Sequence, residues 1–79
     1  MRRKKSWQGR LQCDYFWVDA RLSRQNGRWI ASVATPDGPT LAWGGTALSA
    51  LVGALEPFNG IAIDLIHSAP RDLIQILAP

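Results

Sequence analysis

Few side chains in this sequence could take part in catalysis, because its titratable groups are sparse. His67 and Cys13 are the single histidine and cysteine, and the six Asp and Glu residues form no cluster along the chain. General acid–base catalysis and metal binding both require such groups to converge. The segment Gly44-Gly45-Thr46 lacks the spacing and the lysine of a phosphate-binding loop. We therefore expect a protein that is not an enzyme and has no metal site, no cofactor and no small-molecule substrate.

A basic segment at the start of the chain could contact nucleic acid. Cationic side chains neutralise phosphates, and an indole ring can stack on a base, as in single-strand binding proteins. This hypothesis assigns the contacts to six residues: Arg2, Arg3, Lys4, Lys5, Trp7 and Arg10. The alternative is a solvated basic arm with no partner.

Tyrosine, tryptophan and arginine recur between residues 15 and 28 and could form a surface for a protein partner or for self-association. The alternation of the sequence places Trp17 and Ile30 on the polar face of a sheet, and these residue types dominate binding energy at interfaces. The hypothesis assigns partner contacts to four residues: Tyr15, Trp17, Arg21 and Arg28. The alternative is that the C-terminal segment covers this face. Trp29 and Trp43 are predicted to be packing residues.

Alternating hydrophobicity predicts strands on both sides of Asp14. In residues 6–13, Trp7 and the other apolar side chains occupy odd positions. From Phe16 onwards the apolar side chains occupy even positions. Because one inserted residue exchanges the two faces of a strand, we expect a bulge or sharp bend near Asp14 and Tyr15.

Asn26-Gly27 predicts a two-residue type I′ hairpin, since both central residues of that turn need positive φ. The loop would pair Gln25 with Arg28 and Val18 with Thr35. This register collects one apolar face, made of Val18, Ala20, Leu22, Trp29, Ala31 and Val33. That face is expected to form the core.

A turn, a third strand and a helix are predicted next. Pro-Asp-Gly at residues 36–38 favours a turn, and residues 40–43 favour a strand. Thr46 is a good N-cap. Four apolar residues follow it at helical spacing: Leu48, Leu51, Val52 and Leu55. The sequence therefore predicts an amphipathic helix that ends at Pro57 and packs on the apolar face of the sheet.

The C-terminal part of the chain is ambiguous at first and then helical. Residues 61–66 fit either a buried strand or a helix. Ser68, followed by a proline and an aspartate, is typical of the N-cap of a last helix. The apolar residues of that helix are Leu73, Ile74 and Leu77.

The length and charge of the chain limit its domain organisation and its location in the cell. The 79 residues are enough for one small domain, which we place at residues 6–79 after a basic arm at residues 1–5. Residues 1–30 hold eight Arg and Lys against two Asp, a net +6, and residues 31–79 hold one Arg against four acids, a net −3. The lone cysteine, and the lack of an apolar run after the basic start, predict a cytoplasmic protein without contact to a membrane.

A series of short motifs spans residues 16–56. They are Gly27-Arg28-Trp29-Ile30-Ala31, Thr35-Pro36-Asp37-Gly38, Gly45-Thr46, Ala50-Leu51 and Ala54-Leu55. In this order they resemble the partial-fold domain of the HicB-type antitoxins. The resemblance implies a β-β-β-α core with a further strand, a small ribonuclease toxin as partner, and dimerisation through the sheet or the tail.

The chain departs from that family in three ways. Ala47 and Ser49 stand where the family's helix usually opens with acidic residues. An additional predicted strand precedes the core, and no ribbon-helix-helix or helix-turn-helix segment is visible after it. Direct autoregulation by DNA binding is therefore not expected.

Together these patterns predict an α+β domain. We expect an antiparallel sheet of three or four strands, one amphipathic helix packed on one face, and a partly helical C-terminal tail. The leading functional hypothesis is a small non-catalytic bacterial protein-interaction or regulatory module, antitoxin-like, that binds its partner through the outer sheet face. Nucleic-acid binding through the basic arm is the alternative.

Overall fold

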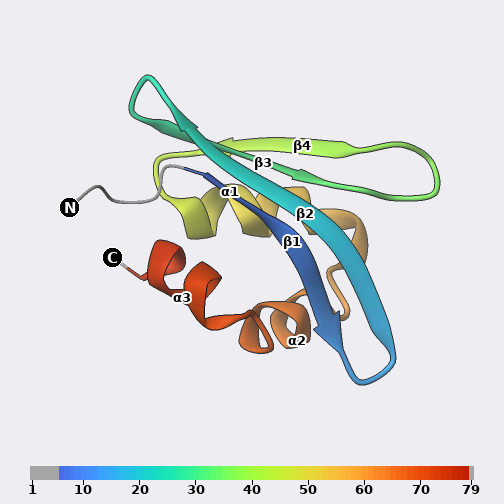
Figure 1. Ribbon diagram of the computed structural model, residues 1–79. Coiled ribbons are helices and arrows are strands. Elements are labelled where there is room, and N and C mark those ends of the chain that lie inside the picture. The colour runs from blue at the N-terminus through green and yellow to red at the C-terminus, as the bar shows by residue number, and fades with distance from the viewer. Residues whose placement is uncertain (1–5, 79) are drawn as a thin grey trace.

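The computed structural model describes residues 6–78 and shows a four-stranded antiparallel sheet covered by helices (Figure 1). The elements in order are β1 (Ser6–Cys13), β2 (Phe16–Gln25), β3 (Arg28–Val33), β4 (Thr40–Gly44), α1 (Ala47–Ala54), a short 3₁₀ turn (Glu56–Phe58), α2 (Ala62–His67) and α3 (Arg71–Leu77). The strands lie in the sheet in sequence order. This confirms the predicted α+β fold class, with four strands and a helix packed on the sheet.

The first two strands form a hairpin, so of the two predicted alternatives near Asp14 and Tyr15 the sharp bend is present and the bulge is not. Cys13 pairs with Phe16, which leaves Asp14 and Tyr15 as a two-residue turn. Directly opposed residues of an antiparallel pair carry their side chains on the same face. The apolar side chains therefore occupy odd positions before the turn and even positions after it without any inserted residue.

The second hairpin has the predicted turn and most of the predicted register. Asn26 and Gly27 have φ angles of 53° and 79°, as a type I′ turn requires. Gln25 pairs with Arg28, as the sequence indicates.

The predicted pair between Val18 and Thr35 is absent, because this ladder ends at Ala20 and Val33. Thr35 instead joins the next turn. Its hydroxyl oxygen accepts a hydrogen bond of 3.2 Å from the amide of Asp37.

Helix α1 begins where predicted but buries a different stripe. Thr46 caps it and forms a reciprocal capping box with Ser49. Leu48 and Val52, predicted to be buried, are 41% and 49% exposed. The side that packs inward is made of Ala47, Ala50, Leu51, Ala54 and Leu55. Alanines occupy most of it because the helix lies close to β3 and β4, where larger side chains would not fit.

The C-terminal segment forms two helices on the same side of the sheet as α1 (Figure 1). Ser68 ends α2 as its C-cap, and Pro70 is the N-cap of α3, so the predicted N-cap is shifted by two residues. Of the predicted apolar residues of α3, Leu73 is buried, Leu77 is half-buried and Ile74 is exposed. The alternative in which this segment covers the outer sheet face is therefore wrong.

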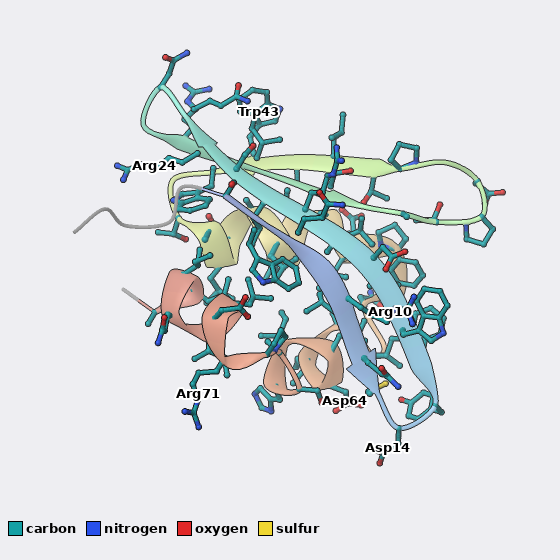
Figure 2. All side chains as sticks on the ribbon, viewed as in Figure 1. Arg10, Asp14, Arg24, Trp43, Asp64 and Arg71 are labelled. Atoms are coloured by element: carbon teal, nitrogen blue, oxygen red, sulfur yellow. The ribbon has the colours of Figure 1, made fainter. Side chains whose placement is uncertain are left out.

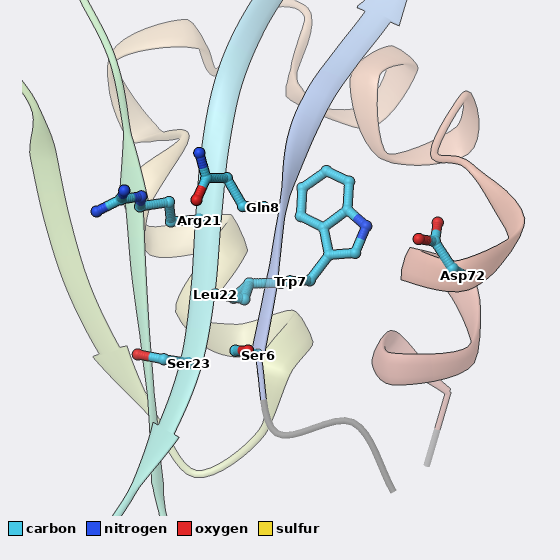
Figure 3. Close-up of a pocket in the computed structure, with 7 residues that line it drawn as sticks. All are labelled: Ser6, Trp7, Gln8, Arg21, Leu22, Ser23 and Asp72. Carbon is cyan, nitrogen blue, oxygen red and sulfur yellow. The ribbon is translucent and has the colours of Figure 1, made fainter.

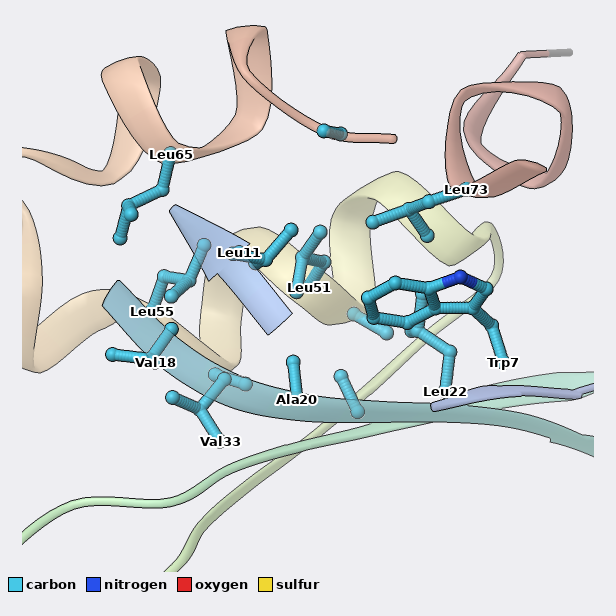
Figure 4. Packing of buried hydrophobic residues seen from close by; sticks show 14 residues of the cluster. Trp7, Leu11, Val18, Ala20, Leu22, Val33, Leu51, Leu55, Leu65 and Leu73 are labelled. Carbon is cyan, nitrogen blue, oxygen red and sulfur yellow. The ribbon is translucent and has the colours of Figure 1, made fainter. Parts of the chain in front are cut away.

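The core lies between the sheet and the three helices (Figure 4). Each helix contributes a fully buried leucine: Leu51 from α1, Leu65 from α2 and Leu73 from α3. Leu55, the C-cap of α1, is fully buried as well. These side chains meet the inner faces of the strands, which contribute Trp7, Leu11, Val18, Ala20, Leu22, Ala31 and Val33. The sheet thus has one covered face, called the inner face below, and one outer face.

Candidate interaction surface

No helix of residues 6–78 covers the outer face of the sheet (Figure 2). Alternation along the paired strands places on it Gln8, Arg10, Gln12, Trp17, Asp19, Arg21, Ser23, Arg28, Ile30, Ser32, Leu41 and Trp43. The set mixes arginines, tryptophans and aliphatic residues with small polar ones. Exposed surfaces of this composition are typical of protein interfaces.

An aromatic–arginine cluster, made of Arg10, Trp17 and Asp19, lies near the turn of the first hairpin. The guanidinium carbon of Arg10 stands over the Trp17 ring, 3.8 Å from its centroid. Arg10 Nε also lies 3.5 Å from Asp19 Oδ1, and the two side chains are 53% and 60% exposed. Exposed contacts of this kind are worth about 1 kcal/mol or less each, so their main effect is to orient the ring. Trp17 itself remains 49% exposed.

Arg21 and Arg28 lie on the outer face as the sequence predicts, but well away from Trp17 and Tyr15. Arg21 is four residues beyond Trp17 on β2, and Arg28 lies beside Gln25 at the far end of the same strand. At about 3.3 Å per residue, the predicted residues extend over roughly 30 Å. They line the length of the face and do not form one compact patch.

Tyr15 belongs to the rim of the surface and points to the helical side. It lies in the turn between β1 and β2 and is 69% exposed. Its hydroxyl donates a long hydrogen bond of 3.5 Å to Asp64 Oδ2 of α2. The pKa of the phenol is raised above its usual value, and partial desolvation is the largest cause. The negative charge of Asp64 is the next cause. The side chain therefore ties the hairpin to α2.

An edge cluster of Ile30, Leu41 and Trp43 extends the outer face, and the sequence reasoning placed only Ile30 on it. Trp43 was predicted to be a packing residue, yet it is 59% exposed, and Leu41 is 70% exposed. Ile30 pairs with Trp43 in the register of β3 and β4, so all three side chains lie on the outer face. The signal was available, because alternation through β4 puts the two large residues on one face and Ala42 on the other.

The structure does not support Trp7 as a base-stacking residue. Trp7 is 7% exposed and packs in the core with Leu22 and Leu73 (Figure 4). A buried ring has no open face for a base. Arg10 is engaged with Trp17 and Asp19 on the outer face, and Arg2, Arg3, Lys4 and Lys5 lie outside the described residues.

A shallow depression of about 410 Å³ lies beside the start of β1 (Figure 3). Arg21 and Gln8 border it from the outer face, and Trp7 and Asp72 border it from the side of α3. It holds no group of residues that could perform acid–base chemistry together. Within residues 6–78 no three His, Cys, Asp or Glu side chains gather in a way that could hold a metal ion.

None of the helices in residues 6–78 has the length and apolarity needed to cross a lipid bilayer.

Comparisons with known proteins add no relative to this description. The resemblance to HicB-type antitoxins stays a prediction. The chain matches no protein-family model, no curated protein and no solved structure.

Proposed function

We propose that this protein is a non-catalytic module that binds a protein partner on the outer face of its sheet. The observation that carries the proposal is the exposed Trp17 ring, held in place by Arg10 on a face that the helices leave open. A preoriented aromatic ring loses little conformational freedom on binding, which favours its use as an anchor.

The charges along the same face indicate the chemistry of the partner. Arg21 and Arg28 are exposed, and Asp19 is the acidic side chain of the face, already beside Arg10. A partner surface with carboxylates around an apolar pocket for Trp17 would complement this arrangement. The predicted antitoxin-like role would be one case of such binding.

Exposed apolar residues also occur on the helical side, but they differ in kind. Leu48, Val52, Ile63 and Ile74 are all exposed there. All four are aliphatic side chains, unlike the aromatic ring of Trp17 under the guanidinium of Arg10. Scattered aliphatic residues of this type are common on protein surfaces, whereas tryptophan with arginine is enriched at binding hot spots.

Site-specific photocrosslinking tests the proposal. A photoreactive phenylalanine analogue at position 12, which is exposed and lies directly opposite Trp17 on β1, is compared with the same analogue at position 63, which is exposed on α2. We expect a discrete protein adduct from position 12 and none from position 63. Once the partner is purified, Trp17→Ala should weaken its binding by about tenfold or more, and Ile63→Ala should leave it unchanged.

Two results would contradict the proposal. Equal crosslinking from both positions would show that the outer face is not the binding surface. Adducts with nucleic acid, lost as salt rises, would favour the alternative in which the basic residues bind phosphates.

A further inference from the structure

The open edge of β4 presents backbone groups that are set up for pairing. The amide of Ala34 donates to the carbonyl of Asp19 over 2.9 Å. Because hydrogen-bonded pairs alternate along an antiparallel ladder, Ala31 then directs its N–H and C=O towards β4, where it faces Ala42. Leu41 and Trp43 consequently direct their N–H and C=O groups away from β3. They point to the free edge of β4, where the described residues form no further strand.

We propose that β4 pairs with β4 of a second copy, antiparallel, about a two-fold axis at Ala42. This register places Leu41 opposite Trp43 of the second copy, and Trp43 opposite its Leu41. Both of these pairs are hydrogen-bonded pairs. Together they use the N–H and C=O groups of Leu41 and of Trp43 on each chain. The two sheets become one continuous sheet of eight strands.

The side chains of the same residues fit this arrangement. Leu41 and Trp43 are 70% and 59% exposed on the outer face, next to Ile30. In the paired register each Trp43 lies beside Leu41 of the other chain, so the two edge clusters merge across the axis. Aromatic and aliphatic cross-strand neighbours of this type stabilise antiparallel pairs.

A second copy fits the β4 edge better than it fits the other edge of the sheet. β4 reads Thr-Leu-Ala-Trp-Gly, with no charged residue and no proline, which are the features that usually block strand pairing. β1 carries Arg10 and contacts α2. Pairing of two identical uncharged strands brings no like charges together, and a two-fold contact closes on itself as a dimer.

Charge substitutions on the β4 edge test the interaction and its register together. In Leu41→Lys/Trp43→Lys each lysine would face a lysine of the second copy, whereas in Leu41→Lys/Trp43→Glu each lysine would face a glutamate. The monomer–dimer equilibrium is measured by sedimentation equilibrium over a range of protein concentrations. Circular dichroism and thermal unfolding confirm that the variants fold, as expected for positions this exposed.

We expect the wild-type protein to dimerise in a concentration-dependent manner. The lysine–lysine variant should raise the dissociation constant by about tenfold or more, since like charges directly opposite destabilise strand pairs. The lysine–glutamate variant should dimerise more strongly than the lysine–lysine variant, and added salt should weaken that advantage.

A wild-type protein that stays monomeric at every concentration would overturn the proposal and leave the edge for a strand of another protein. Equal dimerisation of both charge variants would also overturn it. Trp17→Ala should leave the equilibrium unchanged, so failure of this proposal and failure of partner binding at Trp17 can be told apart.

Discussion

Trp7 and Trp17 lie on adjacent strands of one hairpin but on opposite faces of the sheet. Trp7 is 7% exposed and Trp17 is 49% exposed. We expect Trp7→Ala to lower the free energy of unfolding by about 3–5 kcal/mol, the usual cost of removing a buried aromatic side chain. Trp17→Ala should cost about 1 kcal/mol or less, since it loses a surface contact with Arg10.

Urea unfolding followed by circular dichroism checks both values. Trp7→Phe is a milder variant that keeps most of the buried ring, should Trp7→Ala fail to fold. Equal destabilisation by the two alanine substitutions would mean that Trp17 is a core residue, and the outer face would then lose its anchor.

Tyr15 is the single tyrosine of the chain, so its ionisation can be followed directly. We expect the tyrosinate absorbance to appear at a higher pH than in a free tyrosine, because partial desolvation and the charge of Asp64 raise the pKa of its phenol. A raised pKa in the folded state stabilises the fold below the unfolded pKa of about 10, and this stabilisation is lost as the pH rises through the folded pKa.

Spectrophotometric titration of Asp64→Asn tests the contribution of the carboxylate. The midpoint should move down towards the ordinary value but not reach it, because desolvation remains the larger cause. An unchanged midpoint would show that α2 does not approach the hairpin turn as closely as the 3.5 Å contact indicates.

The junction of β4 and α1 depends on the absence of a side chain at Gly44. A Cβ atom there would lie 2.7 Å from the backbone nitrogen of Ala50, whereas one at Gly45 would meet nothing within 4 Å. We expect Gly44→Ala to destabilise the protein by roughly 1–3 kcal/mol through this steric overlap. Gly45→Ala, the adjacent control, should be neutral or slightly stabilising.

Thermal and urea unfolding of the two variants measure the difference. Similar stability of both proteins would show that α1 can shift away from β4 without cost, contrary to the close packing of its alanine side on the sheet.

The elements fixed by local chemistry were predictable from sequence. The Asn26-Gly27 turn, the register that follows from it and the Thr46 cap each depend on a backbone preference of one or two residues. The buried stripe of α1 was not predictable in the same way. Hydrophobicity favours Leu48 and Val52, but the close contact with the sheet selects alanines, and that distance depends on tertiary packing.

The candidate surface was predicted in part, since its extent depends on the whole molecule. Strand parity placed Trp17, Arg21 and Arg28 on the outer face correctly. Whether that face is covered depends on the path of the chain after the 3₁₀ turn, which no local pattern in residues 61–67 fixed. Trp43 was misassigned because its strand was considered next to the helix and not within the alternation of the sheet.

All three helices pack on one side because the inner face needs more cover than α1 alone supplies. α1 contacts β3 and β4, α2 contacts β1, and α3 contacts α1. Leu73 of α3 is fully buried beside Trp7, while the next residue, Ile74, is 49% exposed. The last helix therefore closes the core over the start of β1, which keeps the C-terminal segment away from the outer face.

Substitution of these two neighbours tests that closure. We expect Leu73→Ala to lower the free energy of unfolding by about 2–5 kcal/mol, as for other buried leucines. The same substitution should make the adjacent ring of Trp7 more accessible to a fluorescence quencher. Ile74→Ala should change stability by about 0.5 kcal/mol or less, because its side chain is largely in solvent. Urea unfolding and fluorescence quenching measure both effects. Should Leu73→Ala prove as mild as Ile74→Ala, α3 would not be docked on the inner face, and an outer face left open by the C-terminal helices would have no structural basis.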